Sequence, residues 1–161
     1  MKLFLKNLLF TLIIPGTVAV YAPLLIAHGR KITSYPVLLS IGVVLFIAGA
    51  ATYLWTVWDF AVAGRGTPLP IEAPEKLVVR GLYRHIRNPM YVGVIMFILG
   101  WASVFTDYWL LIYALGVGIA VHLFVVLYEE PRLKELFGEK YESYKTVVGR
   151  WVPRPRRNRL H

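Results

Sequence analysis

Residues 108–128 read YWLLIYALGVGIAVHLFVVLY, and the acidic pair Glu129-Glu130 follows this run directly. The run holds 21 residues without a Lys, Arg, Asp or Glu, and a helix needs about 20 apolar residues to cross a ~30 Å hydrocarbon core. Carboxylates at the edge of such a span are costly to keep, so they indicate function. The stretch therefore predicts a transmembrane helix that ends at a functional site.

Three other apolar segments accompany this one, at residues 8–27, 37–58 and 90–105, the last with only 16 residues. Hydrophobic residues make up 57% of the 161 positions and the mean hydropathy is +0.57, which is too apolar for a soluble domain of this length. We therefore expect an all-α fold, a polytopic membrane helix bundle of about four transmembrane helices plus a C-terminal amphipathic helix.

Basic residues are unevenly distributed between the segments that flank the four spans. If the N-terminus is cytoplasmic, the inner segments 1–7, 59–89 and 129–161 carry 16 of the 18 Lys and Arg, as the positive-inside rule requires. We expect a multi-pass protein of a prokaryotic cytoplasmic membrane with both termini inside. The net charge of +9 then reflects contact with membrane lipids and needs no nucleic acid. The chain has no cysteine, which excludes thiol catalysis.

The candidate functional residues all lie in the second half of the chain. A joint rich in Gly and Pro at residues 63–70 cannot extend a helix. We expect it to divide a single membrane domain, 1–161, into two N-terminal helices at 1–63 and a functional half at 64–161.

Asn88-Pro89 predicts the start of a helix, with Asn88 as N-cap and Pro89 at the first helical position. A helix start presents free N–H groups and a partial positive charge, so it can bind an anion. Arg84 and Arg87 add cationic donors nearby, although anchoring at the membrane surface explains them equally well.

Glu129-Glu130-Pro131 places two carboxylates where the dipole of the preceding helix opposes them. We expect the helix to break at Pro131, with Glu130 as the cap of a new helix and Glu129 facing the bundle. His122 lies two turns earlier and shares that face. These three residues are the catalytic candidates. The structural alternatives are capping for Glu130 and an interhelical hydrogen bond for His122.

The final segment, residues 131–148, has apolar side chains at spacings of three and four. This pattern predicts one amphipathic helix folded back on the bundle at the membrane interface. Tyr141 and Tyr144 would lie at headgroup depth and anchor the helix. Contact with a cofactor is the alternative for these two side chains.

Together these motifs resemble the isoprenylcysteine carboxyl methyltransferase family and, more loosely, the phospholipid N-methyltransferases. The resemblance covers residues 66–153. The motifs that carry it are Gly81-Leu82-Tyr83, Arg87-Asn88-Pro89-Met90-Tyr91-Val92-Gly93, Glu129-Glu130-Pro131-Arg132-Leu133 and Phe137-Gly138, with Tyr141, Tyr144 and Arg150.

The resemblance implies an integral membrane enzyme that uses S-adenosylmethionine and no metal. It implies carboxyl O-methylation of a lipid-like or prenylated acceptor. Eukaryotic members of the family have His where Asn88 stands and an Arg where Val125 stands. Carried over by position, the cofactor contacts are Leu77, Val78, Tyr83, Arg87, Asn88, Pro89, Met90, Tyr91 and Glu129.

Two other functions remain open from the sequence. The first is a phospholipid or lipid amine N-methyltransferase, for which Glu129, Glu130 or His122 would accept the proton that the amine must lose. The second is a non-catalytic membrane interaction protein, in which the neighbourhoods of Asn88 and Glu129 need not meet. Tyr83 and Tyr91 favour the enzyme, because aromatic faces can stabilise a sulfonium by cation–π contact.

Overall fold

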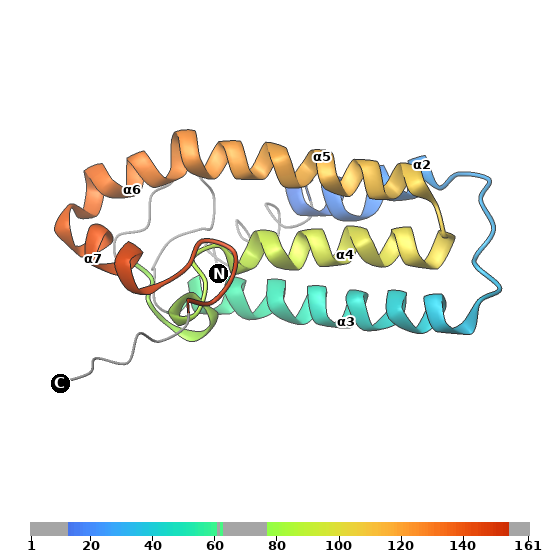
Figure 1. Ribbon diagram of the computed structural model, residues 1–161, viewed down its shortest axis with the longest axis horizontal. Coiled ribbons are helices and arrows are strands. Elements are labelled where there is room, and N and C mark those ends of the chain that lie inside the picture. Colours follow the sequence, from blue (N-terminus) through green and yellow to red (C-terminus); the bar gives the residue numbers. More distant parts are fainter. Residues whose placement is uncertain (1–12, 61, 63–76, 155–161) are drawn as a thin grey trace.

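The computed structural model describes residues 13–60, 62 and 77–154, and within these residues its regular elements are helices (Figure 1). The all-α prediction is confirmed. In chain order the elements are η1 (Thr17–Tyr21), α2 (Ala22–Ile26), α3 (Pro36–Asp59), η3 (Gly81–Arg84), α4 (Pro89–Phe105), α5 (Tyr108–Phe124), η4 (Val125–Glu129), α6 (Glu130–Phe137) and α7 (Glu139–Val147).

Helices α3, α4 and α5 lie side by side along the length of the molecule (Figure 1). They confirm the helices expected at 37–58, 90–105 and 108–128 to within a few residues. A helix at Ile13–Ile26 covers the described part of the first expected span, whose residues 8–12 lie outside the description, as does the joint at 63–70.

Two helices, Pro36–Asp59 and Tyr108–Phe137, are long and apolar enough to cross a membrane, and only 17% of the apolar window of each is buried. The core helix of a soluble protein would bury much more of its apolar surface. Continuous exposed apolar surface of this kind marks contact with lipid or a partner. The two shorter apolar helices, Ile13–Ile26 and Pro89–Phe105, pack beside them. This pattern indicates a membrane protein.

Glycines bring α3 and α4 into close contact at two levels. A Cβ added to Gly49 would lie 2.7 Å from the carbonyl oxygen of Gly93, and one added to Gly93 would lie 2.8 Å from that of Gly49. Gly42 and Gly100 approach in the same way, at 3.1 and 3.2 Å. Small residues at such crossings let transmembrane helices approach backbone to backbone. The contact fixes the start of α4, where the site residues lie, against α3.

The expected break at Pro131 is wrong. The helix that begins at Tyr108 continues through η4 into α6 and ends at Phe137, a length of 30 residues. Pro131 has no N–H to donate to the preceding turn. The wide π turn η4 lies directly before it, and such turns absorb local defects in helix hydrogen bonding. Glu130 has helical backbone angles and does not cap a separate helix.

The single helix expected at 131–148 is also wrong. It is divided at Gly138, whose φ of 51° ends α6 in a conformation that glycine adopts at little cost. Helix α7 then turns back onto the end of the bundle. Tyr141 and Tyr144 are buried there, at 2% and 8% exposure, so their rings pack inside the protein and do not reach out to lipid. They pack with Val148 and are covered by Leu77, Leu133 and Phe137.

We predict that Gly49→Ala lowers the free energy of unfolding by about 1–3 kcal/mol, because the added methyl group overpacks the contact with Gly93. Gly116→Ala is the matched control, since a Cβ there meets no atom within 4 Å. We expect the control to be neutral or stabilising by up to about 1 kcal/mol. Denaturant titration in detergent measures both variants. Equal effects would contradict the close packing of α3 and α4.

Candidate functional site

Glu130 holds three separate segments together at one end of the bundle. Its Oε1 lies 2.9 Å from Nη1 of Arg87 and 2.7 Å from Nε of Arg150, and its Oε2 lies 3.0 Å from Nη2 of Arg150. The Arg150 contact is bidentate, the strongest geometry for such a pair. It also raises the pKa of Arg150 above its ordinary value. Glu130 thus joins α6, the loop before α4 and the segment after α7.

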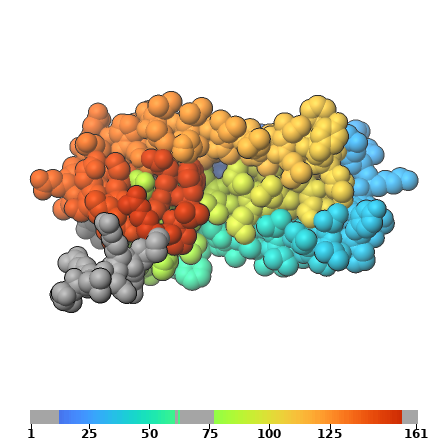
Figure 2. All heavy atoms as spheres, in the orientation of Figure 1, coloured from blue at the N-terminus to red at the C-terminus, as the bar shows by residue number. Residues whose placement is uncertain are grey.

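Helix α7 fastens the loop before α4 through its two buried tyrosines. Nη1 of Arg87 donates to Oη of Tyr141 at 3.3 Å, and Oη of Tyr144 donates to the carbonyl oxygen of Tyr83 at 2.6 Å. Burial raises the pKa of Tyr144, so its hydroxyl keeps the proton that it donates. The backbone N–H of Arg87 donates to the carbonyl of Gly149 at 2.8 Å. The C-terminal segment covers this end of the bundle beside α6 (Figure 2).

Asn88 precedes α4 as expected, but its side chain does not cap the helix. Its Nδ2 donates instead to the carbonyl oxygen of Arg150, at 3.3 Å. The contact between Glu130 and Arg150 places the Arg150 carbonyl near the start of α4. The Asn88 amide bonds to this carbonyl and not to the first turn of the helix. Pro89 at the first helical position is confirmed. Arg84, the other expected cation here, is exposed.

Glu129 is half-buried and faces Tyr91, whose Oη donates to its Oε2 at 3.1 Å. Within the described ranges, no Lys or Arg forms an ion pair with it. Tyr83 lies close by: burial raises the pKa of its phenol and the charge of Glu129 raises it further, so the ring remains neutral. A carboxylate without a cation beside two neutral aromatic rings is suited to bind a positive group.

His122 is exposed and its Nδ1 accepts a hydrogen bond from Nε1 of Trp151, at 3.1 Å. The two side chains line a cavity of about 300 Å³ together with Tyr91. His122 is therefore linked to the site indirectly, by its hydrogen bond to Trp151 and by the cavity wall that it shares with Tyr91. In the described part of the chain, no hydrogen bond joins it to either carboxylate.

The remaining expected contacts are apolar and mostly buried. Val78, Pro89 and Met90 are buried, and Leu77 packs against Tyr141 and Tyr144. Met90 belongs to the core between α3, α4 and α5. Whether these four side chains touch a cofactor stays a prediction.

Sequence reasoning missed Asp59, a buried carboxylate at the end of α3 with 2% exposure. Its Oδ1 lies 3.7 Å from Nε of Arg80, and a Cβ on Gly81 would overlap its other oxygen. Asp59 is also one of the charges that raise the pKa of Tyr83. Asp59 follows an apolar segment directly, as Glu129 does. The cost of a charge at the edge of a membrane span was the signal that could have identified Asp59.

Comparison with known proteins bears on the same region. A family model described as phospholipid methyltransferase matches residues 37–140, from α3 into α7. The chain is also similar to the methanethiol S-methyltransferase of Pseudomonas deceptionensis, with 40% identity over 77 residues. That alignment covers 48% of this chain and 28% of the relative, so this chain spans well under half of its length. No solved structure matches.

We predict that Glu130→Gln destabilises the protein by about 3–5 kcal/mol, because it leaves two arginines without their carboxylate, one of them buried. Glu129→Gln is the control, since its amide oxygen still accepts from Tyr91, and we expect a change below about 1 kcal/mol. Thermal unfolding in detergent, followed by circular dichroism, measures both. An equal loss in the two variants would contradict the division of roles between these neighbours.

Proposed function

Because the chain belongs to the phospholipid methyltransferase family, we propose that it is a membrane enzyme that transfers a methyl group from S-adenosylmethionine to an apolar acceptor. The observation that carries this proposal is the pairing of Tyr91 with Glu129, an acidic group without a neighbouring cation among the described residues. This contact joins the start of α4 to the end of η4. The non-catalytic alternative does not require these neighbourhoods to meet, so the contact favours the enzyme.

The residues of the site fit the chemistry of S-adenosylmethionine. When bound, this cofactor supplies an electrophilic methyl group on a positively charged sulfonium. Glu129 can accept hydrogen bonds from ribose hydroxyls or an ammonium group. Tyr83 and Tyr91 offer neutral aromatic faces to a cation, a contact worth about 0.5–2 kcal/mol. Positioning of this kind supplies much of the acceleration of a displacement reaction.

The acceptor favoured by the geometry is neutral. Arg87 and Arg150, the two arginines of the site, both contact Glu130. Val125 is buried at 1%, at the position where the resemblance to eukaryotic isoprenylcysteine carboxyl methyltransferases implies an Arg. The isoprenylcysteine resemblance implies a carboxylate acceptor. Such an acceptor would have to compete with Glu130 for Arg87 or Arg150. The similarity to a methanethiol methyltransferase makes an apolar thiol the first candidate. Carboxyl O-methylation and lipid amine N-methylation are the alternatives.

A thiol or an amine must lose a proton during methylation, so a base has to lie near the acceptor. Glu129 is the carboxylate nearest to Tyr91, and His122 lines the adjoining cavity. Glu130 is excluded from this role by its two arginine partners. Of the three catalytic candidates, the proposal therefore retains Glu129 and His122 and assigns Glu130 to positioning.

We further propose that four helices cross a prokaryotic cytoplasmic membrane with both termini inside. The site forms at the end of the bundle where α3 ends and α4 begins, the end that the positive-inside rule assigns to the cytoplasm. The opposite end carries Arg30 and Lys31, the two basic residues that lie outside the inner segments. There, Nε of Arg30 lies 2.9 Å from Oδ2 of Asp107. The site would then open toward soluble S-adenosylmethionine in the cytoplasm.

Methyl transfer tests the proposed function. Protein in lipid nanodiscs is incubated with methyl-labelled S-adenosylmethionine and, separately, octanethiol, palmitate or phosphatidylethanolamine. We expect label in a thioether, which base does not hydrolyse. We expect Tyr91→Phe to slow the reaction about tenfold, the cost of one hydrogen bond to a charged group. A base-labile ester or a methylamine would support the corresponding alternative. No transfer by folded protein to any of the three would contradict the proposal.

A further inference from the structure

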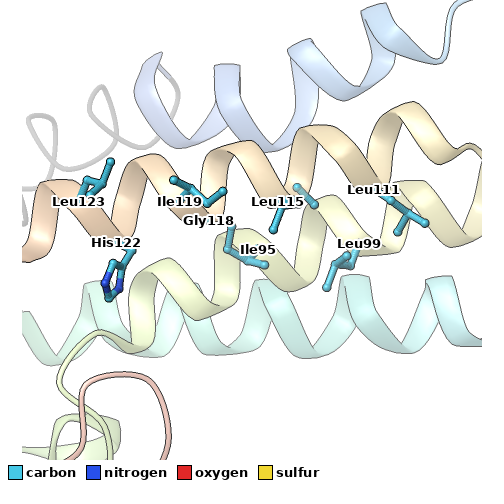
Figure 3. Close-up of a pocket in the computed structure, with 9 residues that line it drawn as sticks. Ile95, Leu99, Leu111, Leu115, Gly118, Ile119, His122 and Leu123 are labelled. Atoms are coloured by element: carbon cyan, nitrogen blue, oxygen red, sulfur yellow. The ribbon is translucent and has the colours of Figure 1, made fainter.

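Two adjoining cavities lie between α4 and α5, and Tyr91 lines one of them. The larger is an open groove of about 440 Å³, lined by Ile95 and Leu99 from α4 and by Leu115, Gly118 and His122 from α5 (Figure 3). The smaller, of about 300 Å³, is lined by Tyr91, Gly118, His122 and Trp151 among others. Ile95, Gly118 and His122 line both, so the two cavities adjoin along these side chains.

The smaller cavity borders the proposed cofactor site through Tyr91. Tyr91 forms part of the wall of the smaller cavity, and its hydroxyl contacts Glu129 at 3.1 Å. In the other direction the lining of the groove extends along α5 from His122 to Leu111 (Figure 3). At a rise of about 1.5 Å per residue, those eleven steps span roughly 16 Å. Together, the two adjoining cavities thus have the length of an extended aliphatic chain that ends beside Tyr91.

Trp151 closes the smaller cavity on one side and is held there from two directions. The adjacent Arg150 is fixed by its bidentate contact with Glu130, and the indole N–H of Trp151 donates to Nδ1 of His122 at 3.1 Å. A bulky side chain held in this way forms a fixed wall of the cavity. It limits the size of what can lie next to Tyr91.

We propose that these two cavities form the acceptor site and that their occupant is an uncharged aliphatic molecule with a compact nucleophilic end. The inference rests on the proposed methyltransferase function and names its substrate class. The aliphatic body lies in the groove between α4 and α5, and the reacting end lies under Trp151 next to Tyr91. The lining is apolar except for Tyr91, His122 and the indole N–H. An anionic headgroup would lose its hydration there without a Lys or Arg among the described lining residues, at a cost that disfavours it.

Gly118 offers a direct test, because it lies where the two cavities meet. A Cβ added there meets only Ile95 Cδ1, at 4.0 Å, which is ordinary contact. Gly118→Leu therefore places its side chain in the cavities without displacing backbone. Gly116→Leu is the matched control, because it is the same change on the same helix two residues away. A Cβ on Gly116 meets nothing within 4 Å, and Gly116 lines neither cavity.

The first readout is binding and needs no turnover. Bromine quenches tryptophan fluorescence at short range, so 1-bromooctane reports on occupation of the cavity beside Trp151. In detergent solution we expect quenching with a saturable component that disappears in Trp151→Phe. We expect Gly118→Leu to weaken this component about tenfold and Gly116→Leu to leave it intact. Quenching that does not saturate, or that is equal in the two leucine variants, means probe dissolved in detergent only and overturns the proposal.

The second readout is selectivity between octanethiol and ethanethiol as acceptors. We expect Gly118→Leu to raise the KM for octanethiol relative to ethanethiol about tenfold, and to keep the affinity for S-adenosylhomocysteine, which shows that it is folded. An unchanged ratio overturns the acceptor site while the methyltransferase function stands. Saturable quenching without methylation of any acceptor would instead overturn the proposed function and leave the aliphatic binding site in place.

Discussion

The ion pairs of Glu130 with Arg87 and Arg150 hold the functional end of this molecule together. Each partner comes from a different segment: α6, the loop before α4, and the chain after α7. Most contacts of the site follow from this junction. It brings the Arg150 carbonyl to Asn88, sets α7 over Tyr83, and places Trp151 against His122. Removing both charges from water is expensive, so the pairs are stable only while all three segments stay in place.

The two adjacent carboxylates have opposite surroundings, and this difference is the chemical basis of the site. Glu130 is neutralised by two guanidinium groups, whereas Glu129 accepts a hydrogen bond from a phenol and forms no ion pair among the described residues. Both lie at the end of the wide turn η4, where successive side chains point to different neighbours. Glu130 faces the basic C-terminal segment and Glu129 faces α4. One carboxylate can thus hold the fold while the other stays free for a cationic or hydroxylated ligand.

Sequence patterns predicted the parts of the structure that depend on local composition. Apolar length identified α3, α4 and α5, and the cost of charge near a membrane pointed to Glu129 and Glu130. The errors have tertiary causes. Arg150 attracts Glu130 and the Asn88 amide away from capping roles, and the turn η4 accommodates Pro131 within a continuous helix. The break at Gly138 is the exception, because a glycine at this position is a local signal for the end of a helix. The contact partners of Asp59 and Trp151, by contrast, lie far away in the sequence.

Calorimetric binding of S-adenosylhomocysteine to the detergent-purified protein tests the central claim most directly. The account predicts micromolar binding to the wild type and at least about a tenfold weaker affinity for Glu129→Gln, since a neutral amide cannot replace the carboxylate that we propose contacts the cofactor. The variant should remain folded, because Glu129 has no part in the Glu130 junction. Wild-type affinity in Glu129→Gln, or no binding by folded wild-type protein, would contradict the assignment of this carboxylate to the cofactor.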